Sequence, residues 1–571
     1  MKEAIRAYLR DRGVAGDGPA ATVPGPSFAY VFGATLGFLL VVEAISGIAL
    51  AAFYAPSASD AWGSVAYLQD QATLGWFLRG LHFHGASATV IVAGLHLVQT
   101  ALHGAYKKPR EVVWWLGIVL LLLVLAWAVT GYVLRWDQAG YWANKVEIGI
   151  AAATPVLGNL VRAMALGGND YGNLTLTRFY ALHILILPAI VGAVTWGHVA
   201  LARRLGPTPF GDRERPAVPR WPEQTLRNAI AMAIVLVGLF AYVIAMHGVE
   251  LASPADPSQA YDARPLWYFR WLFELRDLAG SAEKLVALAV PAVVIAGLVA
   301  LPLVDTGDLR GPRHRKAYVA GLAGLLVVIA GLTVASFVAD ARDDQLAKRV
   351  AKAGQRAQLA RRLARDNGVP VTGGGDVFFS SPMARARAVF AQRCKGCHDA
   401  DSKDRKGPVI APGHGSRDWL QAFLKKPSGE AFWGLTKLAK TDAAMKSFAQ
   451  MPGADFEGIV ELIYSQSGAT DVDADRRKHG LEVFETACSD CHALEDGMPG
   501  SSAPGLYGVG SREYYLSFIS NPKSALHMGR DKSQMPRFDA ELSVVDRDAL
   551  AEYLVWLRTA TPEDLAALDP Y

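Results

Sequence analysis

The first 340 residues of the chain alternate between long apolar segments and short polar connections. A helix of about 20 apolar residues spans a hydrocarbon core of about 30 Å, so segments of this length are candidate membrane helices. Seven such segments lie at about 29–53, 75–103, 112–134, 177–203, 223–247, 281–303 and 317–338. The pattern predicts an all-α fold that begins with a seven-helix transmembrane bundle.

The pattern changes after residue 339. Residues 340–366 are charged and lack a long apolar run, which predicts a solvated helical spacer. The Gly-rich stretch from Gly368 to Gly375 follows and marks a domain boundary. We therefore interpret residues 340–381 as a charged spacer and a Gly-rich linker.

The C-terminal part of the chain contains an internal repeat. Cys394-Lys-Gly-Cys-His398 returns 94 residues later as Cys488-Ser-Asp-Cys-His492, and Gly415-Ser-Arg returns 95 residues later as Gly510-Ser-Arg. Each copy ends in an amphipathic segment. The repeat predicts two small all-α modules, at 382–470 and 471–571.

Lys and Arg are concentrated in alternate connections between the apolar segments. Segments 1–28, 104–111, 203–222 and 304–316 hold 16 of them, and the other three connections hold 6. Because positive residues stay on the cytoplasmic side, residues 1–28 are predicted to be a cytoplasmic lead-in. Seven crossings then place the repeat on the periplasmic side of a bacterial inner (cytoplasmic) membrane.

All four cysteines of the chain belong to the two Cys-x-x-Cys-His motifs. This motif is typical of covalent haem c, with two thioether bonds and the histidine as one axial ligand. The alternative, a Cys-x-x-Cys metal or redox site, gives the adjacent histidine no role. We therefore expect two haem c groups. The predicted attachment residues are Cys394, Cys397 and His398 in the first copy, and Cys488, Cys491 and His492 in the second.

Methionine is the expected second ligand of each haem c, since it raises the reduction potential. Met535 precedes a proline in the second copy, and the first copy offers Met445 and Met451. Met445 and Met535 both lie eight residues before the start of the last amphipathic helix, which favours Met445. Met451 remains an alternative because it also precedes a proline.

Two apolar segments carry histidines at matched intervals. His82 and His96 are fourteen residues apart, and His183 and His198 are fifteen apart. Fourteen residues make nearly four helical turns, so the two rings share a face and lie about 21 Å apart along the axis. A lone histidine in such a helix is usually a satisfied core group. Two matched pairs instead predict two haem b sites, His82 with His183 and His96 with His198.

Glycines occur at the same interval in two further apolar segments. Gly33 and Gly47 are fourteen residues apart, as are Gly117 and Gly131. Glycine has no side chain to hold a flat macrocycle away from the backbone. The four glycines are therefore predicted to line the two haem b sites.

These residues carry a resemblance to a known family. Residues 28–338 resemble the cytochrome b of quinol–cytochrome c oxidoreductases, the cytochrome bc and bf complexes. The matching stretches are Gly33…Gly47, Leu78-Arg79…His82…Gly85-Ala86-Ser87…His96, Trp114…Gly117…Gly131-Tyr132-Val133-Leu134 and Thr177-Arg178…His183. The resemblance implies a haem-b four-helix domain at 29–205 and a three-helix C-terminal domain at 206–339. Each copy of the repeat resembles a class I cytochrome c.

The resemblance also implies roles for polar residues near the outer face. Arg79 and Arg178 would contact haem propionates. The family's quinol motif, Pro-Glu-Trp-Tyr, reads here Pro265-Leu266-Trp267-Tyr268, so the carboxylate that accepts a quinol proton is missing. Glu274 is the nearest acid after the motif, and Asp262 or a chain of waters are alternatives.

The resemblance implies a cytochrome b/dihaem cytochrome c subunit that oxidises quinol and passes electrons to a soluble periplasmic cytochrome c or similar acceptor, with proton translocation. A Rieske iron–sulfur protein must then be a separate chain, because no cysteine remains for a cluster. A homodimer of the complex in membrane lipid is expected. The alternative is a Rieske-free linear conduit between the quinone pool and periplasmic carriers. The net charge of +4 gives no indication of nucleic-acid binding.

Overall fold

The computed structural model divides the chain into two compact units, which are described separately. The described residues are 11, 22–209, 218–440, 445–529 and 533–568. The first unit comprises Met1–Arg365 and Val369–Gly375, and the second comprises Asp366–Gly368 and Asp376–Tyr571. Most of the predicted lead-in 1–28 lies outside the described residues.

Helices dominate both units, which confirms the predicted all-α class. The described residues form a single two-stranded antiparallel sheet, in which β1 (Thr22–Val23) pairs with β2 (Val218–Pro219). Short helical turns connect the longer elements. They are η1 (Phe28–Tyr30), η3 (Trp267–Phe269), η4 (Gly280–Ala282), η5 (Pro312–His314), η6 (Gly374–Phe379) and η7 (Lys437–Lys440).

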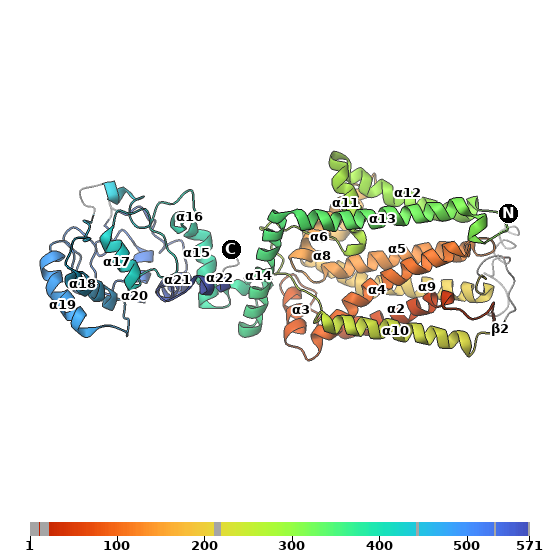
Figure 1. Cartoon of the computed structure of the whole chain (residues 1–571), viewed down its shortest axis with the longest axis horizontal. Helices are drawn as coiled ribbons and strands as arrows, with labels where there is room; N and C mark the ends of the chain where they lie inside the picture. The colour runs from red at the N-terminus through yellow and green to blue at the C-terminus, as the bar shows by residue number, and fades with distance from the viewer. Residues whose placement is uncertain (1–10, 12–21, 210–217, 441–444, 530–532, 569–571) are drawn as a thin grey trace. The chain divides into compact units, whose positions relative to one another are not determined.

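Seven long apolar helices build the first unit and run side by side (Figure 1). They are α2 (Phe32–Ala51), α4 (Gly75–Leu102), α5 (Glu111–Val133), α8 (Asn173–Ala181) with its continuation η2 (Leu182–Ile186) and α9 (Leu187–Leu205), α10 (Glu223–Ala245), α12 (Glu283–Val304) and α13 (Lys316–Arg342). Each is long and apolar enough to cross a membrane, which confirms the seven segments predicted from the sequence.

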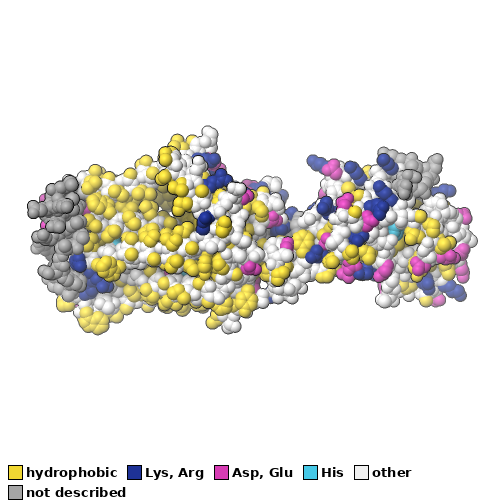
Figure 2. Space-filling view, turned by 180° about the vertical axis from the view of Figure 1, so that it is seen from behind, with side chains coloured by type: hydrophobic (Ala, Val, Ile, Leu, Met, Phe, Trp, Pro, Cys, Tyr) yellow, Lys and Arg dark blue, Asp and Glu magenta, His cyan; other side chains and the backbone are white. Residues whose placement is uncertain are grey.

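The outer surface of this bundle is suited to lipid. Large apolar side chains face outward, among them Ile45, Trp196 and Val327, each at least 66% exposed. On the face shown in Figure 2, hydrophobic side chains cover the first unit, whereas Lys, Arg, Asp and Glu are interspersed over the second. An exposed apolar surface of this kind marks contact with a membrane rather than with water.

Four shorter helices lie in the connections that the charge distribution assigns to the outer side. They are α3 (Ala61–Asp70), α6 (Gln138–Ala152), α7 (Gly158–Leu166) and α11 (Arg270–Ala279). The fully buried Asp137 caps α6 through the Gly140 amide, forms an ion pair with Arg135 and accepts a hydrogen bond from the Ala252 amide. This contact fixes the connection before the quinol motif against α6.

The predicted solvated spacer is helical but not fully solvated. It forms α14 (Asp344–Asn367), and one face of this helix is buried. Arg361 forms an ion pair with Asp70 of α3, and in the linker the Gly374 amide donates to the Ser59 carbonyl at 2.9 Å. Leu and Ala at helical spacing form the buried apolar stripe of α14. Because many of these side chains are short, the stripe was not recognised in the sequence.

The second unit contains the repeat. The first copy forms α15 (Pro382–Arg393), α16 (Lys395–His398), α17 (Arg417–Lys425) and α18 (Gly453–Gln466). The second copy forms α19 (Ala474–Ala487), α20 (Arg512–Ser520), α21 (Val544–Leu557) and α22 (Pro562–Leu568). The amphipathic segments predicted at the end of each copy correspond to α18 and α21.

The two copies do not fold as the separate modules 382–470 and 471–571 expected from the sequence. Helix α15 packs on α21, and α18 packs on α19, so the first helix of each copy contacts the last helix of the other. One core joins Phe390 of α15 to Tyr553 of α21. The other joins Leu462 of α18 to Phe484 of α19. Sequence similarity identifies the copies but does not determine which helices pair.

Candidate functional site

His82 of α4 and His183 of η2 face each other across the bundle. Their ring centroids are 6.1 Å apart, and the ring planes cross at 86°. Two metal–imidazole bonds of about 2 Å, together with the distances from ring centre to nitrogen, give about 6 Å. The pair therefore has the separation required to ligate one iron ion from both sides.

Glycines leave room for these rings. A Cβ atom on Gly47 would lie 3.1 Å from Cε1 of His82, and one on Gly131 would lie 2.5 Å from Cε1 of His183. Both values are below ordinary van der Waals contact. The glycines thus accommodate the ligand imidazoles themselves, a closer role than the macrocycle contact expected from their spacing.

Hydrogen bonds hold both outer imidazoles in one orientation. Nδ1 of His82 lies 3.0 Å from Ser46 Oγ and 3.0 Å from Glu43 Oε2. Nδ1 of His183 lies 3.1 Å from the Trp127 carbonyl oxygen. An occupied Nδ1 leaves Nε2 as the metal-binding atom. Sequence reasoning did not identify Glu43, although an acid in an apolar segment is itself a signal of a functional contact.

The second pair, His96 and His198, lies toward the end of α4 and α9 that the charge distribution assigns to the inner side. Nδ1 of His198 lies 3.0 Å from the Val113 carbonyl oxygen, and the two imidazoles interact electrostatically. A Cβ atom on Gly117 would lie 3.4 Å from His198, and one on Gly33 would lie 3.7 Å from His96. The predicted histidines and glycines are therefore brought together at both levels.

A π-helical turn explains the fifteen-residue interval between His183 and His198. The segment η2 (Leu182–Ile186) contains His183 and interrupts an otherwise α-helical span. A π-turn takes up one residue more than an α-turn, and such bulges are frequent at functional sites. The extra residue lets both histidines of this helix face those of α4.

The two arginines predicted to bind propionates differ in their surroundings. Arg79 is buried and donates to Gln69 Oε1 at 2.6 Å, to the Val249 carbonyl at 2.8 Å and to the Glu250 carbonyl at 2.9 Å. Its Nη atoms thus connect α4 to the connection after α10, and of its five N–H donors Nε–H and one Nη2–H remain for a further acceptor. Arg178 is exposed on α8.

The quinol motif forms the turn η3. Pro265 and Leu266 precede it, and the rings of Trp267 and Tyr268 are 5.4 Å apart in an edge-to-face arrangement. Glu274 follows on α11 and is half-buried. The motif is thus structured as a compact aromatic cluster.

Glu147 of α6 is the acid with the largest charge effect on Tyr268, and it also acts on Tyr132. Asn144 donates to it at 3.4 Å, and burial raises the pKa of the Glu147 carboxyl to about 8. Sequence reasoning considered Glu274 after the motif and Asp262 before it, and missed Glu147. The missed signal was an acid in a connection otherwise rich in buried aromatic side chains.

The two Cys-x-x-Cys-His motifs have the same local geometry. Nδ1 of His398 hydrogen-bonds the Pro408 carbonyl oxygen at 2.8 Å, and Nδ1 of His492 bonds that of Pro504 at 2.8 Å. Burial lowers the pKa of both imidazoles, which keeps them neutral. Each Nε2 is then free to bind iron. A Cβ on Gly407 would lie 2.7 Å from His398, so this loop also requires glycine.

A single cavity of about 800 Å³ in the second unit is lined by both motif histidines, by the cysteines of the second motif and by the candidate methionines: His398, His492, Cys488, Cys491, Met445, Met451 and Met535. Cys394 and Cys488 are half-buried, and Cys397 and Cys491 are exposed. Met535 packs against the core that contains Cys394. Met445 and Met451 pack against the core that contains Cys488. Each candidate methionine thus packs against the same core as the first cysteine of the other copy's motif.

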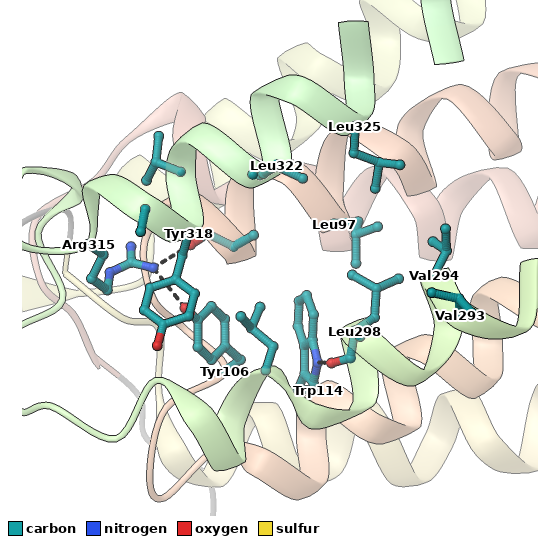
Figure 3. Close-up of a pocket in the computed structure, with 16 residues that line it drawn as sticks. Leu97, Tyr106, Trp114, Val293, Val294, Leu298, Arg315, Tyr318, Leu322 and Leu325 are labelled. Carbon is teal, nitrogen blue, oxygen red and sulfur yellow. Dashed lines mark hydrogen bonds between the residues drawn. The ribbon is translucent and has the colours of Figure 1, made fainter. Parts of the chain in front are cut away.

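A separate pocket of about 370 Å³ lies between α4, α5, α12 and α13 (Figure 3). Its walls are mainly apolar. The polar groups at its edge already have partners, since Trp114 Nε1 donates to the Leu298 carbonyl and Arg315 donates to Tyr106 and to the Ala101 carbonyl. This chemistry suits an acyl or isoprenoid chain better than a quinone ring, whose carbonyls need hydrogen-bond donors.

Family models match three parts of the chain. Residues 22–206 match "Cytochrome b/b6/petB", and residues 254–352 match "Cytochrome b(C-terminal)/b6/petD". Residues 475–554 match "Cytochrome C oxidase, cbb3-type, subunit III". The first two matches cover the elements that carry the histidine pairs and the quinol motif.

Similar proteins agree with these matches. Cytochrome b of Rhodobacter capsulatus is 33% identical over 357 residues, covering 56% of this chain and 80% of the relative. The menaquinol:cytochrome c reductase cytochrome b subunit of Bacillus subtilis is 39% identical over 181 residues, covering 32% and 81%. A chain of a solved "Hyperthermophilic respiratory Complex III" matches with TM-score 0.50 and 25% identity, covering 65% of this chain and 96% of that one. The chain belongs to the cytochrome b family and carries a cytochrome c domain at its C-terminus.

Proposed function

We propose that this protein is the cytochrome b and dihaem cytochrome c subunit of a bc-type quinol–cytochrome c oxidoreductase. The observation that carries the proposal is the pair of facing imidazoles of His82 and His183 at 6.1 Å, with a second pair of histidines, each beside a glycine, further along the same helices. Bound haem supplies one-electron transfer at each site. His82 and His183 would hold one haem b, and His96 and His198 the other.

The second unit would hold two haem c groups through its cysteine motifs, one at Cys394 and Cys397 and one at Cys488 and Cys491. A separate Rieske protein and a soluble periplasmic acceptor complete the electron path, in a homodimeric complex of the inner membrane. The excess of basic residues in alternate connections supports a cytoplasmic N-terminus and a periplasmic second unit.

Oxidation of a quinol releases two electrons and two protons, and the protons require acceptors near the outer face. Leu266 has no lone pair to offer. The charge of Glu147 acts on Tyr268 and Tyr132, and burial raises the pKa of its carboxyl to about 8, so it becomes a proton acceptor as pH rises toward that value. We assign Glu147 as the proton acceptor in place of the missing motif carboxylate, with Glu274 as the alternative.

The proposal is tested by steady-state quinol–cytochrome c reductase activity in membranes that contain the complex. We expect antimycin- or quinol-site-inhibitor-sensitive turnover that depends on this chain and is lost with His82→Ala. Undiminished turnover in the His82→Ala membranes would contradict the proposal. Reduction of the haems by quinol in the same membranes separates loss of chemistry from loss of the protein.

A second candidate is a Rieske-free conduit that passes electrons linearly between the quinone pool and periplasmic carriers. The presence of Leu266 in the motif favours it, because divided electron transfer depends on efficient proton release. Purification of the complex distinguishes the two. A stoichiometric Rieske protein supports the first function, and an active complex without one supports the second.

A further inference from the structure

Small residues lie at both helix crossings of the second unit, and their sizes match the observed pairing of the helices. At the crossing of α18 and α19, a Cβ on Gly480 would lie 2.0 Å from the Gly458 carbonyl oxygen, and a Cβ on Gly458 would lie 3.0 Å from the Gly480 amide nitrogen. Side chains are excluded on both helices. Only a pair of glycines permits this approach.

The other crossing uses a different pair. Ala386 precedes Gly480 by 94 residues, the offset of the repeat, and Ala549 occupies in α21 the place of Gly458 in α18. Both alanines are buried in the core between α15 and α21. Pairing within each copy would instead place Ala549 against Gly480 and Ala386 against Gly458, and the close glycine–glycine approach would be lost. The sequence thus matches glycine with glycine and alanine with alanine.

Charged side chains and hydrogen bonds follow the same crossed pattern. Arg385 of α15 forms an ion pair with Asp546 of α21 at 2.9 Å. The Gly413 amide, which follows the first cysteine motif, donates to the Leu557 carbonyl at the end of α21 at 2.7 Å. The equivalent Gly508 amide donates to Gln466 Oε1 at the end of α18.

In each copy of the repeat, glycine turns lie where the chain passes from one of the two hydrophobic cores of the second unit to the other. Gly413 and Gly415 have φ values of +84° and +80°, and their repeat equivalents Gly508 and Gly510 have +65° and +84°. A left-handed turn at these four positions favours glycine. Before each turn the chain packs with the last helix of the other copy, and after each turn it continues into the body of its own copy.

We propose that the two c haems are held by crossed ligand sets. The haem attached at Cys394 and Cys397, with His398 as one ligand, takes Met535. The haem attached at Cys488 and Cys491, with His492, takes Met445. This inference rests on the proposed covalent haems and adds which segments complete each site. Both sites line one cavity, so the second unit is a single dihaem body rather than two modules on a linker.

The test uses the full chain with one c haem removed at a time. Cys394→Ser/Cys397→Ser leaves only the haem at the second motif, and Cys488→Ser/Cys491→Ser leaves only that at the first. Met445→His, Met451→His and Met535→His are then introduced into each background. Histidine preserves six-coordinate iron, removes the sulfur-to-iron charge-transfer band of the ferric haem and lowers its potential.

The crossed sets predict that Met535→His abolishes the band only when the haem at the first motif remains. Met445→His should abolish it only when the haem at the second motif remains. The reverse pattern would overturn the crossing. Loss of the second haem's band with Met451→His, but not with Met445→His, would overturn Met445 as ligand while upholding the crossing. Absence of covalent haem from both single-motif proteins would instead contradict the proposed function.

A second measurement, which requires no removal of haem, uses the ion pair between Arg385 and Asp546. Arg385→Asp should lower the melting temperature of the second unit's transition in the holoprotein, since it opposes Asp546. Adding Asp546→Arg should restore the melting temperature in the crossed arrangement. Asp455→Arg is the comparison variant, because Asp455 occupies the equivalent place in α18 and would be the partner in a within-copy arrangement. It is measured alone and with Arg385→Asp, since Asp455 pairs with His479 of α19 at 2.7 Å. Restoration by Asp455→Arg alone would overturn the proposal.

Discussion

The two units both display ligands at repeated intervals, but they use the repeats differently. In the membrane bundle, the interval along one helix determines the site, because four turns place His82 and His96 on one face. In the second unit, the interval between copies identifies equivalent residues and not their neighbours. Met535 lies with Cys394 although the two are 141 residues apart in sequence. Periodicity within an element therefore predicts geometry, whereas a repeat between elements leaves the pairing open.

The most drastic way to test the bundle side of this comparison is to remove one ligand. His96→Ala should eliminate the inner haem b and leave the outer one reducible by quinol, because His82 and His183 are held by their own hydrogen bonds. Redox difference spectra should show the b signal halved. Loss of the outer haem alone would reverse the assignment of the two levels.

The glycines offer a graded test of the close contacts. Gly131→Ala places a Cβ at 2.5 Å from His183 and should prevent stable haem binding at the outer site. Gly33→Ala is the matched control, since its Cβ would lie 3.7 Å from His96. We expect wild-type b content in the Gly33→Ala protein. Equal haem loss in both variants would show that the ring contacts do not govern binding.

Glu147→Gln should slow quinol oxidation on the order of 100-fold, a typical contribution of a positioned proton acceptor. Because the pKa of Glu147 is raised to about 8, the carboxyl is mainly protonated below that pH and becomes an acceptor as pH rises through it. The wild-type rate should therefore increase with pH up to about 8, and the variant should lose this increase.

Glu274→Gln and Leu266→Glu are the controls for that assignment. Glu274→Gln should retain the wild-type pH profile. Leu266→Glu supplies the missing motif carboxylate and should accelerate oxidation even in the Glu147→Gln background. A large loss of activity in Glu274→Gln, with none in Glu147→Gln, would transfer the role to Glu274.

The smallest expected effect concerns Glu43. Its carboxylate accepts a hydrogen bond from the His82 imidazole, which makes that ligand more basic and stabilises ferric iron. Glu43→Gln should raise the midpoint potential of the outer haem b by tens of millivolts. The inner haem provides the internal control, since Nδ1 of its proposed ligand His198 contacts the Val113 carbonyl oxygen and not a carboxylate. Redox titration that shows no shift at the outer haem would contradict this role.

The sequence was sufficient to predict the membrane helices and to select histidines that the structure brings together, because each depends on a period within one segment. The sequence did not identify Glu43 or Glu147, because their proposed roles depend on residues of other elements, His82 of α4 and Tyr268 of η3. It interpreted α14 as solvated, because alanines made its apolar stripe weak. It also assigned each methionine to its own copy, since the contacts that indicate the crossed pairing, such as Gly458–Gly480 and Arg385–Asp546, join residues far apart in the repeat pattern.

The central claim is that one chain carries two b haems and two c haems. A pyridine haemochrome assay of the purified full-length protein, before and after extraction of non-covalent haem, measures this most directly. The account predicts equal amounts of b and c before extraction, two of each per polypeptide, and only the c haems afterwards. A clear excess of either type, or a single covalent haem per chain, would contradict it.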